Sequence, residues 1–213
     1  MLDAHTKIIM ERYADRENIG FVHSQLDVLI DRYLSKAMRP TDFIGKTILE
    51  IGAGCSQYTS VFLDNACKTY YANDLIPERL TASLSEDPRY VKLPGDFREI
   101  VVPEQVDIVF ASLTMMFVIP MLNEFIAKIR DTLKPGGIFV SMDPNYLCPL
   151  SIYRRFIDNK PNPAKLFSPF QYAKSFQKSG FDVEKILPFT APFPWTNGNW
   201  VIGTTFWLKA RKL

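Results

Sequence analysis

Cysteine and histidine are scarce in this chain. Its 213 residues include three cysteines, Cys55, Cys67 and Cys148, and two histidines. The cysteines show no metal-ligand spacing and no even-numbered framework, which excludes a zinc motif or a disulfide scaffold built from them. This cysteine usage is typical of proteins in a reducing compartment, so we expect a cytoplasmic location.

Long apolar runs and a strong net charge are also missing. No stretch reaches the length of a membrane-spanning helix, and the first residues are too polar for a signal peptide. The formal net charge of +2 gives no reason to expect a nucleic-acid partner. With 47% hydrophobic and 23% charged residues, the composition is that of one globular domain. We therefore expect neither nucleic-acid binding nor stable membrane insertion.

The most informative feature that is present is an apolar stretch, 48–51, followed by Gly52 and Gly54. This order predicts a buried parallel strand that turns sharply into a helix, with a ligand close to bare backbone. Gln57 replaces the third glycine of the dinucleotide fingerprint. A second predicted strand ends in Asp74, 20 residues after Gly54. A carboxylate there can accept both hydroxyls of an adenosine ribose, which suits NAD as well as S-adenosylmethionine (SAM).

Strands and helices alternate along most of the chain. We expect helices within residues 1–38, followed by strand 47–51, helix 57–66, strand 69–74, helix 77–84, strand 89–92, strand 106–111, helix 121–133, strand 138–142, a helix from Ser168 to Lys178, and strands 181–187 and 200–209. Alternation of this kind predicts parallel strands with helices on both faces of an α/β sheet.

Five motifs in this order carry a family resemblance: 49–54, Asp74, 95–97, 106–110 and 133–139. Through them the sequence resembles the class I SAM-dependent methyltransferases. The resemblance implies a Rossmann-like three-layer sandwich, with a seven-stranded, mostly parallel sheet and an antiparallel last strand. It also implies a single methyltransferase domain over residues 1–213, with an N-terminal helical cap (1–40) and a SAM-binding core (41–213).

The same resemblance assigns nine residues to the cofactor. They would orient the methionine ammonium (Glu50), let the backbone approach the methionine portion (Gly52, Ala53 and Gly54), hold the ribose diol (Asp74), contact adenine and its amino group (Leu75, Asp96 and Phe97), and close the methionine end (Ser112).

No general base stands out in the sequence. His5 and His23 lie in predicted N-terminal helices, which often cover the cofactor in this family, and histidine has a suitable pKa for deprotonating a hydroxyl. For each of them, an ordinary surface or half-buried side chain is the preferred interpretation. Asp143 and Tyr146 follow the fifth predicted strand, at the rim where acceptors bind. The candidates are therefore His23, Asp143 and Tyr146. The fourth strand ends without a carboxylate, so we expect no metal.

These features predict a methyltransferase that acts on a small-molecule or saccharide- or lipid-linked acceptor, at oxygen. Two alternatives stay open: a SAM-binding partner subunit without catalysis, and an NAD-dependent oxidoreductase. The aromatic, proline-rich loop 188–200 is either a wall for the substrate or packing within the core or a homodimer.

Overall fold

The computed structural model describes residues 4–13, 34, 37–54, 58–80, 86–150, 152–153, 168–189, 198–201 and 203–213. The chain divides into two compact units, Met1–Val101 and Val102–Leu213. The described strands form one sheet of order β3-β2-β1-β4-β5-β7-β6, in which only β7 pairs antiparallel with its neighbours. The predicted Rossmann-like α/β fold is therefore confirmed.

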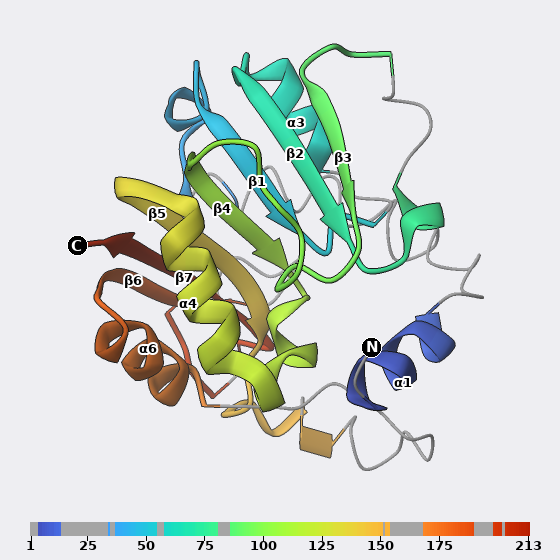
Figure 1. The fold of residues 1–213 in the computed structure, drawn as a ribbon. Helices are drawn as coiled ribbons and strands as arrows, with labels where there is room; N and C mark the ends of the chain where they lie inside the picture. Colours follow the sequence, from blue (N-terminus) through green and yellow to red (C-terminus); the bar gives the residue numbers. More distant parts are fainter. Residues whose placement is uncertain are drawn as a thin grey trace. The chain divides into compact units, whose positions relative to one another are not determined.

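The described residues of the first unit include three parallel strands that end at one edge (Figure 1). They are β1 (Thr47–Ile51), β2 (Thr69–Asp74) and β3 (Tyr90–Pro94). The unit also contains helices α1 (Ala4–Tyr13) and α3 (Tyr58–Asp64), and 3-10 helices η2 (Pro40–Asp42) and η3 (Pro77–Arg79). All five residues of β1 are buried, as expected for the apolar run that the sequence shows.

An aromatic cluster holds α3 against β2. Phe62 is fully buried, and its ring centroid lies 5.1 Å from that of Phe43 and 5.5 Å from that of Tyr70. Tyr58, one helical turn before Phe62, stacks on it at 6.3 Å. Burial of each such ring contributes about 1.5–3 kcal/mol, so this cluster fixes the helix that follows the glycine loop.

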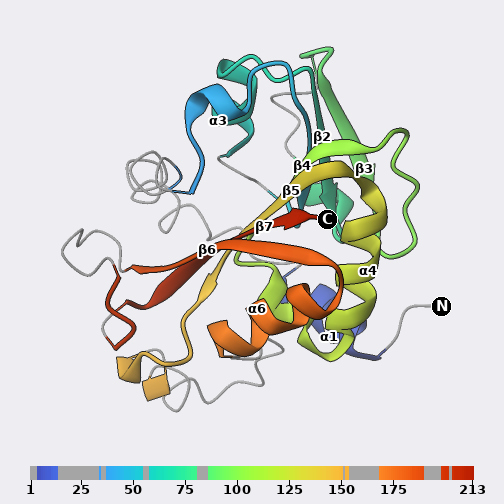
Figure 2. The same ribbon diagram turned by 90° about the vertical axis from the view of Figure 1, so that its left-hand side faces the viewer.

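The described residues of the second unit include four strands and two α-helices, which Figures 1 and 2 show from two sides. The strands are β4 (Val106–Ser112), β5 (Leu133–Pro144), β6 (Phe181–Phe189) and β7 (Thr205–Lys212). The helices are α4 (Leu122–Thr132) and α6 (Pro169–Lys178), with short 3-10 helices η5 (Met115–Phe117) and η6 (Ile119–Met121) after β4.

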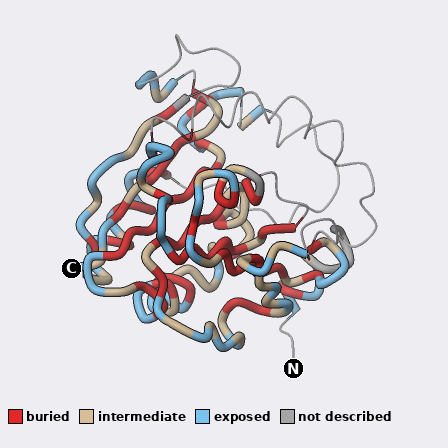
Figure 3. The backbone as a smooth tube through the Cα atoms, turned by 90° about the horizontal axis from the view of Figure 1, so that it is seen from above, coloured by how far each residue is buried: buried red, intermediate tan, exposed pale blue. Residues whose placement is uncertain are grey.

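Large side chains cover both faces of the second unit's strands. Phe139 of β5 stacks on Phe176 of α6 with ring centroids 4.7 Å apart. The rings of Phe110 in β4 and Trp207 in β7 lie 6.1 Å apart on the opposite face. They pair with Val140 and Met142 of β5, whose side chains point away from the face that carries Phe139. Figure 3 shows the buried stretches of chain in red and the exposed turns in pale blue.

The predicted and observed bounds differ by more than two residues in three elements. The segment predicted as helix 77–84 begins as the 3-10 helix η3, and residues 81–85 lie outside the described ones. Strand β5 begins at Leu133 rather than 138, because Leu133 already pairs with Val106 before a register shift. Strand β7 begins at Thr205 rather than 200. The Asn145 side chain donates to the carbonyls of Trp200 and Gly203, which holds that segment in a turn.

Within the described residues, no helix combines the length and the apolar character needed to cross a membrane.

Candidate functional site

The glycine loop follows β1 directly. Gly52 and Gly54 have φ angles of +70° and +48°, a region that side chains other than glycine rarely adopt. The backbone N–H of Ala53 between them donates to the Asn73 carbonyl at 2.8 Å, which ties the loop to the end of β2. A Cβ on Gly54 would lie 3.4 Å from Asp74 Oδ2. A side chain at this position would therefore fill the space beside the carboxylate.

Asp74 ends β2 and is 6% exposed. Its Oδ1 accepts the backbone N–H of Ile76 at 2.8 Å, and the backbone N–H of Gly54 also bonds the carboxylate. Burial raises the pKa of Asp74, while these hydrogen bonds and the Arg79 charge oppose the rise. Arg79 of η3 places Nη2 3.4 Å from the same Gly54 Cβ position. Gly54 is thus flanked by a carboxylate and a guanidinium.

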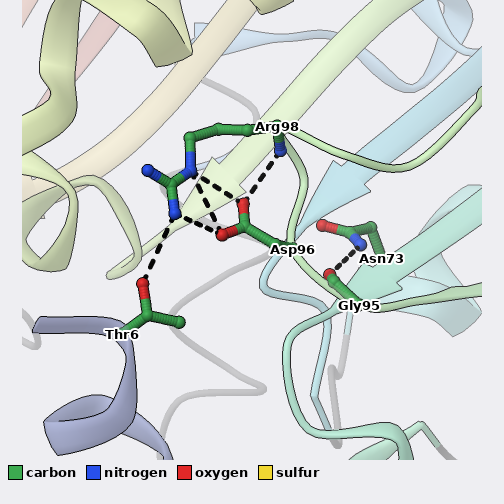
Figure 4. Close-up of polar contacts among 5 residues, drawn as sticks. All are labelled: Thr6, Asn73, Gly95, Asp96 and Arg98. Atoms are coloured by element: carbon green, nitrogen blue, oxygen red, sulfur yellow. Dashed lines mark hydrogen bonds and ion pairs between the residues drawn. The ribbon is translucent and has the colours of Figure 1, made fainter. Parts of the chain in front are cut away.

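The loop after β3 is anchored to Asp74 and its neighbour. The backbone N–H of Gly95 donates to the Asp74 carbonyl at 2.9 Å. The Asn73 side chain donates to the carbonyls of Leu93 (2.7 Å) and Gly95 (2.9 Å), as Figure 4 shows for Gly95. The residues predicted for ribose and for adenine are therefore brought together at one edge of the first unit.

Asp96 is 7% exposed and is held by Arg98 (Figure 4). The Arg98 backbone N–H donates to Oδ1 at 2.9 Å, its Nε lies 3.1 Å from both carboxylate oxygens, and its Nη2 pairs with Oδ2. The same Nη2 lies 3.5 Å from Oγ1 of Thr6 in α1. Thr6 is 92 residues away in the sequence and is also buried.

Glu50 is buried inside β1, where the Tyr70 hydroxyl donates to its Oε2. Thr59 of α3 lies 3.1 Å from the same hydroxyl. Burial, and then the Glu50 charge, raise the pKa of Tyr70 well above its ordinary value, so Tyr70 remains a hydrogen-bond donor. This network orients the Glu50 carboxylate. Its predicted contact with the methionine ammonium stays a prediction.

The other residues assigned to the cofactor lie at strand ends. Leu75, which follows Asp74, is half-buried, and Phe97 is buried beside Asp96. Ser112 ends β4 in the second unit, where its carbonyl accepts the Thr114 hydroxyl at 3.0 Å. All nine cofactor assignments stay predictions.

Asp143, one of the predicted candidates for a general base, is fully buried near the end of β5. Its carboxylate is therefore not exposed to solvent. Its Oδ1 accepts the backbone N–H of Met116 at 3.3 Å, whereas Oδ2 has no hydrogen-bond partner within the described part of the chain. Burial raises its pKa well above the ordinary value, against hydrogen bonds from Ser141, Met116 and Met115. Asp143 therefore supports the segment after β4 from within the core.

The remaining candidates are placed less fully. Tyr146 is 41% exposed, just beyond β5. His23 lies outside the described residues, as does the side chain of His5. Asn145, which lies between Asp143 and Tyr146, is fully buried. Its side chain holds the local backbone, since its Oδ1 accepts the Leu147 N–H at 2.9 Å in addition to the two bonds that its amide donates.

Sequence reasoning missed three residues at this edge: Asn73, Arg79 and Arg98. An amide side chain at the end of an otherwise apolar strand was a usable signal for Asn73. An arginine two residues after a candidate aspartate was a signal for Arg98, because Asp-x-Arg allows a local ion pair. Nothing in the sequence indicated that Arg79 lies beside Gly54. Among the described residues, no group of His, Cys, Asp and Glu could hold a metal ion.

Comparison with known proteins matches residues 49–141 to the methyltransferase domain family. A malonyl-[acyl-carrier protein] O-methyltransferase from Chlorobium luteolum is 31% identical over 100 residues, which are 44% of this chain and 38% of that relative. This chain thus matches less than half of the relative's length.

Two solved structures share the fold at low sequence identity. The N-methyltransferase NodS from Bradyrhizobium japonicum, in complex with S-adenosyl-L-homocysteine (SAH), superposes with a TM-score of 0.70 at 12% identity, covering 98% of both chains. An S-adenosylmethionine-dependent methyltransferase from Mesorhizobium loti gives 0.67 at 16% identity, covering 85% of this chain and 96% of the other. Residues 49–141 thus match the methyltransferase domain family, and the chain shares its fold with solved S-adenosylmethionine-dependent methyltransferases.

Proposed function

We propose that this protein transfers a methyl group from SAM to an oxygen atom of a small-molecule or saccharide- or lipid-linked acceptor. The observation that carries the proposal is the edge of the first unit, where Gly54, Asp74 and Asp96 are tied together by main-chain bonds. The links are Ala53 N–H to the Asn73 carbonyl and Gly95 N–H to the Asp74 carbonyl. Bare backbone beside two buried carboxylates suits an adenosine with a diol and an exocyclic amine.

The residues of this edge fit the cofactor by their chemistry. Asp74 would accept the ribose hydroxyls, and Asp96 would accept the purine amino group. SAM supplies a methyl group already activated by its sulfonium. The protein therefore has mainly to align the acceptor and exclude water. Of the two candidates that the structure describes, Tyr146 is the general base or acceptor contact that solvent can reach, because Asp143 is fully buried.

Oxygen is the acceptor atom that the observations favour. The curated relative from Chlorobium luteolum is named as an O-methyltransferase. The segment after β4 reads Ser112-Leu113-Thr114, without the Asn/Asp-Pro-Pro-Tyr/Phe motif of methyltransferases that act on DNA or glutamine nitrogen. The NodS structure is of an N-methyltransferase, so the shared fold does not select the atom.

Calorimetric titration with SAM, SAH and NADH tests the cofactor. We expect SAM and SAH to bind and NADH not to bind. Binding of NADH alone would favour the oxidoreductase alternative and contradict the proposal. A second assay then follows the transfer of labelled methyl from SAM to a panel of carboxylic acids, acyl thioesters with a free carboxyl group, sugars, lipid-linked saccharides and amines that lack an acceptor oxygen. Labelling of nitrogen-only acceptors would refute the oxygen assignment, and SAM binding without any turnover would favour the partner-subunit alternative.

A further inference from the structure

Two similar Asp-x-Arg ion pairs flank β3, one at each end. Before the strand, the Arg89 backbone N–H donates to Asp87 Oδ1 at 2.9 Å, and its guanidinium bonds both carboxylate oxygens at 3.1 and 2.8 Å. After the strand, the backbone N–H and the guanidinium of Arg98 bond the Asp96 carboxylate in the same way. Arg89 also donates to the Leu63 carbonyl at 2.9 Å, which gives the first pair a structural role.

The pair after β3 lies at the carboxyl end of the parallel strands, the end at which such sheets bind ligands. A carboxylate offers about four acceptor positions. Arg98 fills most of those on Asp96 with three N–H groups, from its backbone, Nε and Nη2. The Nε–H is shared between both oxygens, so the contacts among the described residues leave about one acceptor position for a further donor, on a carboxylate whose orientation is set by the bidentate guanidinium.

The guanidinium that orients Asp96 also contacts α1. Its Nη2 lies 3.5 Å from Thr6 Oγ1, and the Thr6 side chain is 3% exposed (Figure 4). In the contacts among the described residues, Arg98 lies against α1, whereas Arg89 does not. One side chain therefore contacts both Asp96 and α1.

We propose that Arg98 is a positioning residue for recognition of the purine amino group, and that it links this recognition to α1. The inference rests on the proposed function, since it needs an adenosine at the edge of the first unit. Arg98 does not itself contact the reacting atoms. It holds Asp96 so that the acceptor position that is left faces the amino group, and it places α1 beside that position.

The test compares SAH with an SAH analogue that carries hydrogen in place of the purine 6-amino group, by calorimetric titration. We expect the wild-type protein to prefer SAH by about tenfold or more, because the analogue leaves a charged acceptor unmatched. Arg98→Met is expected to reduce this preference to about threefold or less. Arg89→Met is the matched control, and it should keep the wild-type preference. A wild-type preference in Arg98→Met would overturn the proposal.

Further variants separate folding from recognition. If Arg98→Met does not fold, Arg98→Lys keeps the charge but loses the bidentate geometry, and it should also lose most of the preference. Thr6→Val should keep the preference while amide exchange in residues 4–13 becomes faster; unchanged exchange would overturn the link to α1. Wild-type protein that binds neither SAH nor SAM would refute the proposed function instead, so the two failures are distinguishable.

Discussion

Replacement of Asp74 by Asn is the sharpest test of the proposed ribose site. The carboxylate is 6% exposed and already accepts the N–H of Ile76 at 2.8 Å and the N–H of Gly54. A bound diol would donate to its remaining lone pairs. Asn keeps one acceptor oxygen but places an NH₂ donor where the second oxygen stood. The loss of a charge-assisted hydrogen bond costs about 1.5–3 kcal/mol, which is about a 10- to 150-fold weaker Kd for SAM.

The stability of the variant supports this interpretation. Because burial raises the pKa of Asp74, the ionised carboxylate lowers the stability of the folded state at neutral pH. The Asp74→Asn protein lacks that charge, so its urea midpoint should equal or exceed the wild-type value. Replacement by Ala is less informative, since it leaves the N–H groups of Ile76 and Gly54 unmatched at about 1–3 kcal/mol each.

The assay is calorimetric titration with SAM and SAH, with Asp87→Asn as the matched control. Asp87 belongs to the other Asp-x-Arg pair, before β3, and its replacement should leave Kd within about twofold. A folded Asp74→Asn protein whose Kd also stays within about twofold would refute the assignment of Asp74 to the ribose.

Four further outcomes are expected. The affinity for SAM should fall as the pH is lowered through the raised pKa of Asp74, and the fall should start at a higher pH than for an ordinary aspartate. Titrations with SAM in a pH series should show no such fall for Asp74→Asn. The same pH dependence in the variant and the wild type would contradict this prediction. Burial also raises the pKa of Asp143, so the free energy of unfolding should decrease as the pH rises through that pKa. Asp143→Asn should flatten this decrease in urea denaturation and keep most of the turnover, whereas complete loss of turnover would identify Asp143 as a base. Gly137→Ala should cost about 1–3 kcal/mol in the same assay, because its Cβ would lie 2.9 Å from the Lys134 carbonyl oxygen. Gly136→Ala meets no atom within 4 Å but has a φ of +71°, so its cost should be about 1–2 kcal/mol from backbone strain alone.

Local sequence patterns predicted most of the fold. The apolar run before Gly52 specified a buried strand, and β1 and β2 have the predicted bounds. Helix α6 has its predicted Ser168 at the N-cap and Pro169 in the first turn. Boundaries failed where pairing with distant residues decided them, as for β5, whose early start depends on Val106. The start of β7 likewise depends on the side chain of Asn145.

The candidate site divides in the same way. Glycine spacing and strand-final aspartates could be read directly, since backbone conformation and strand periodicity are local properties. The environment of each carboxylate could not be predicted from the sequence. Asp143 looked like a rim residue until its burial was known, and the contact between Arg98 and Thr6 joins residues 92 positions apart. The sequence alone determined that β1 ends at Ile51, directly before the glycine loop, and that β2 ends at Asp74. Only the tertiary structure decided which carboxylates are buried and which cations hold them, because desolvation and ion pairing depend on distances that chain folding sets.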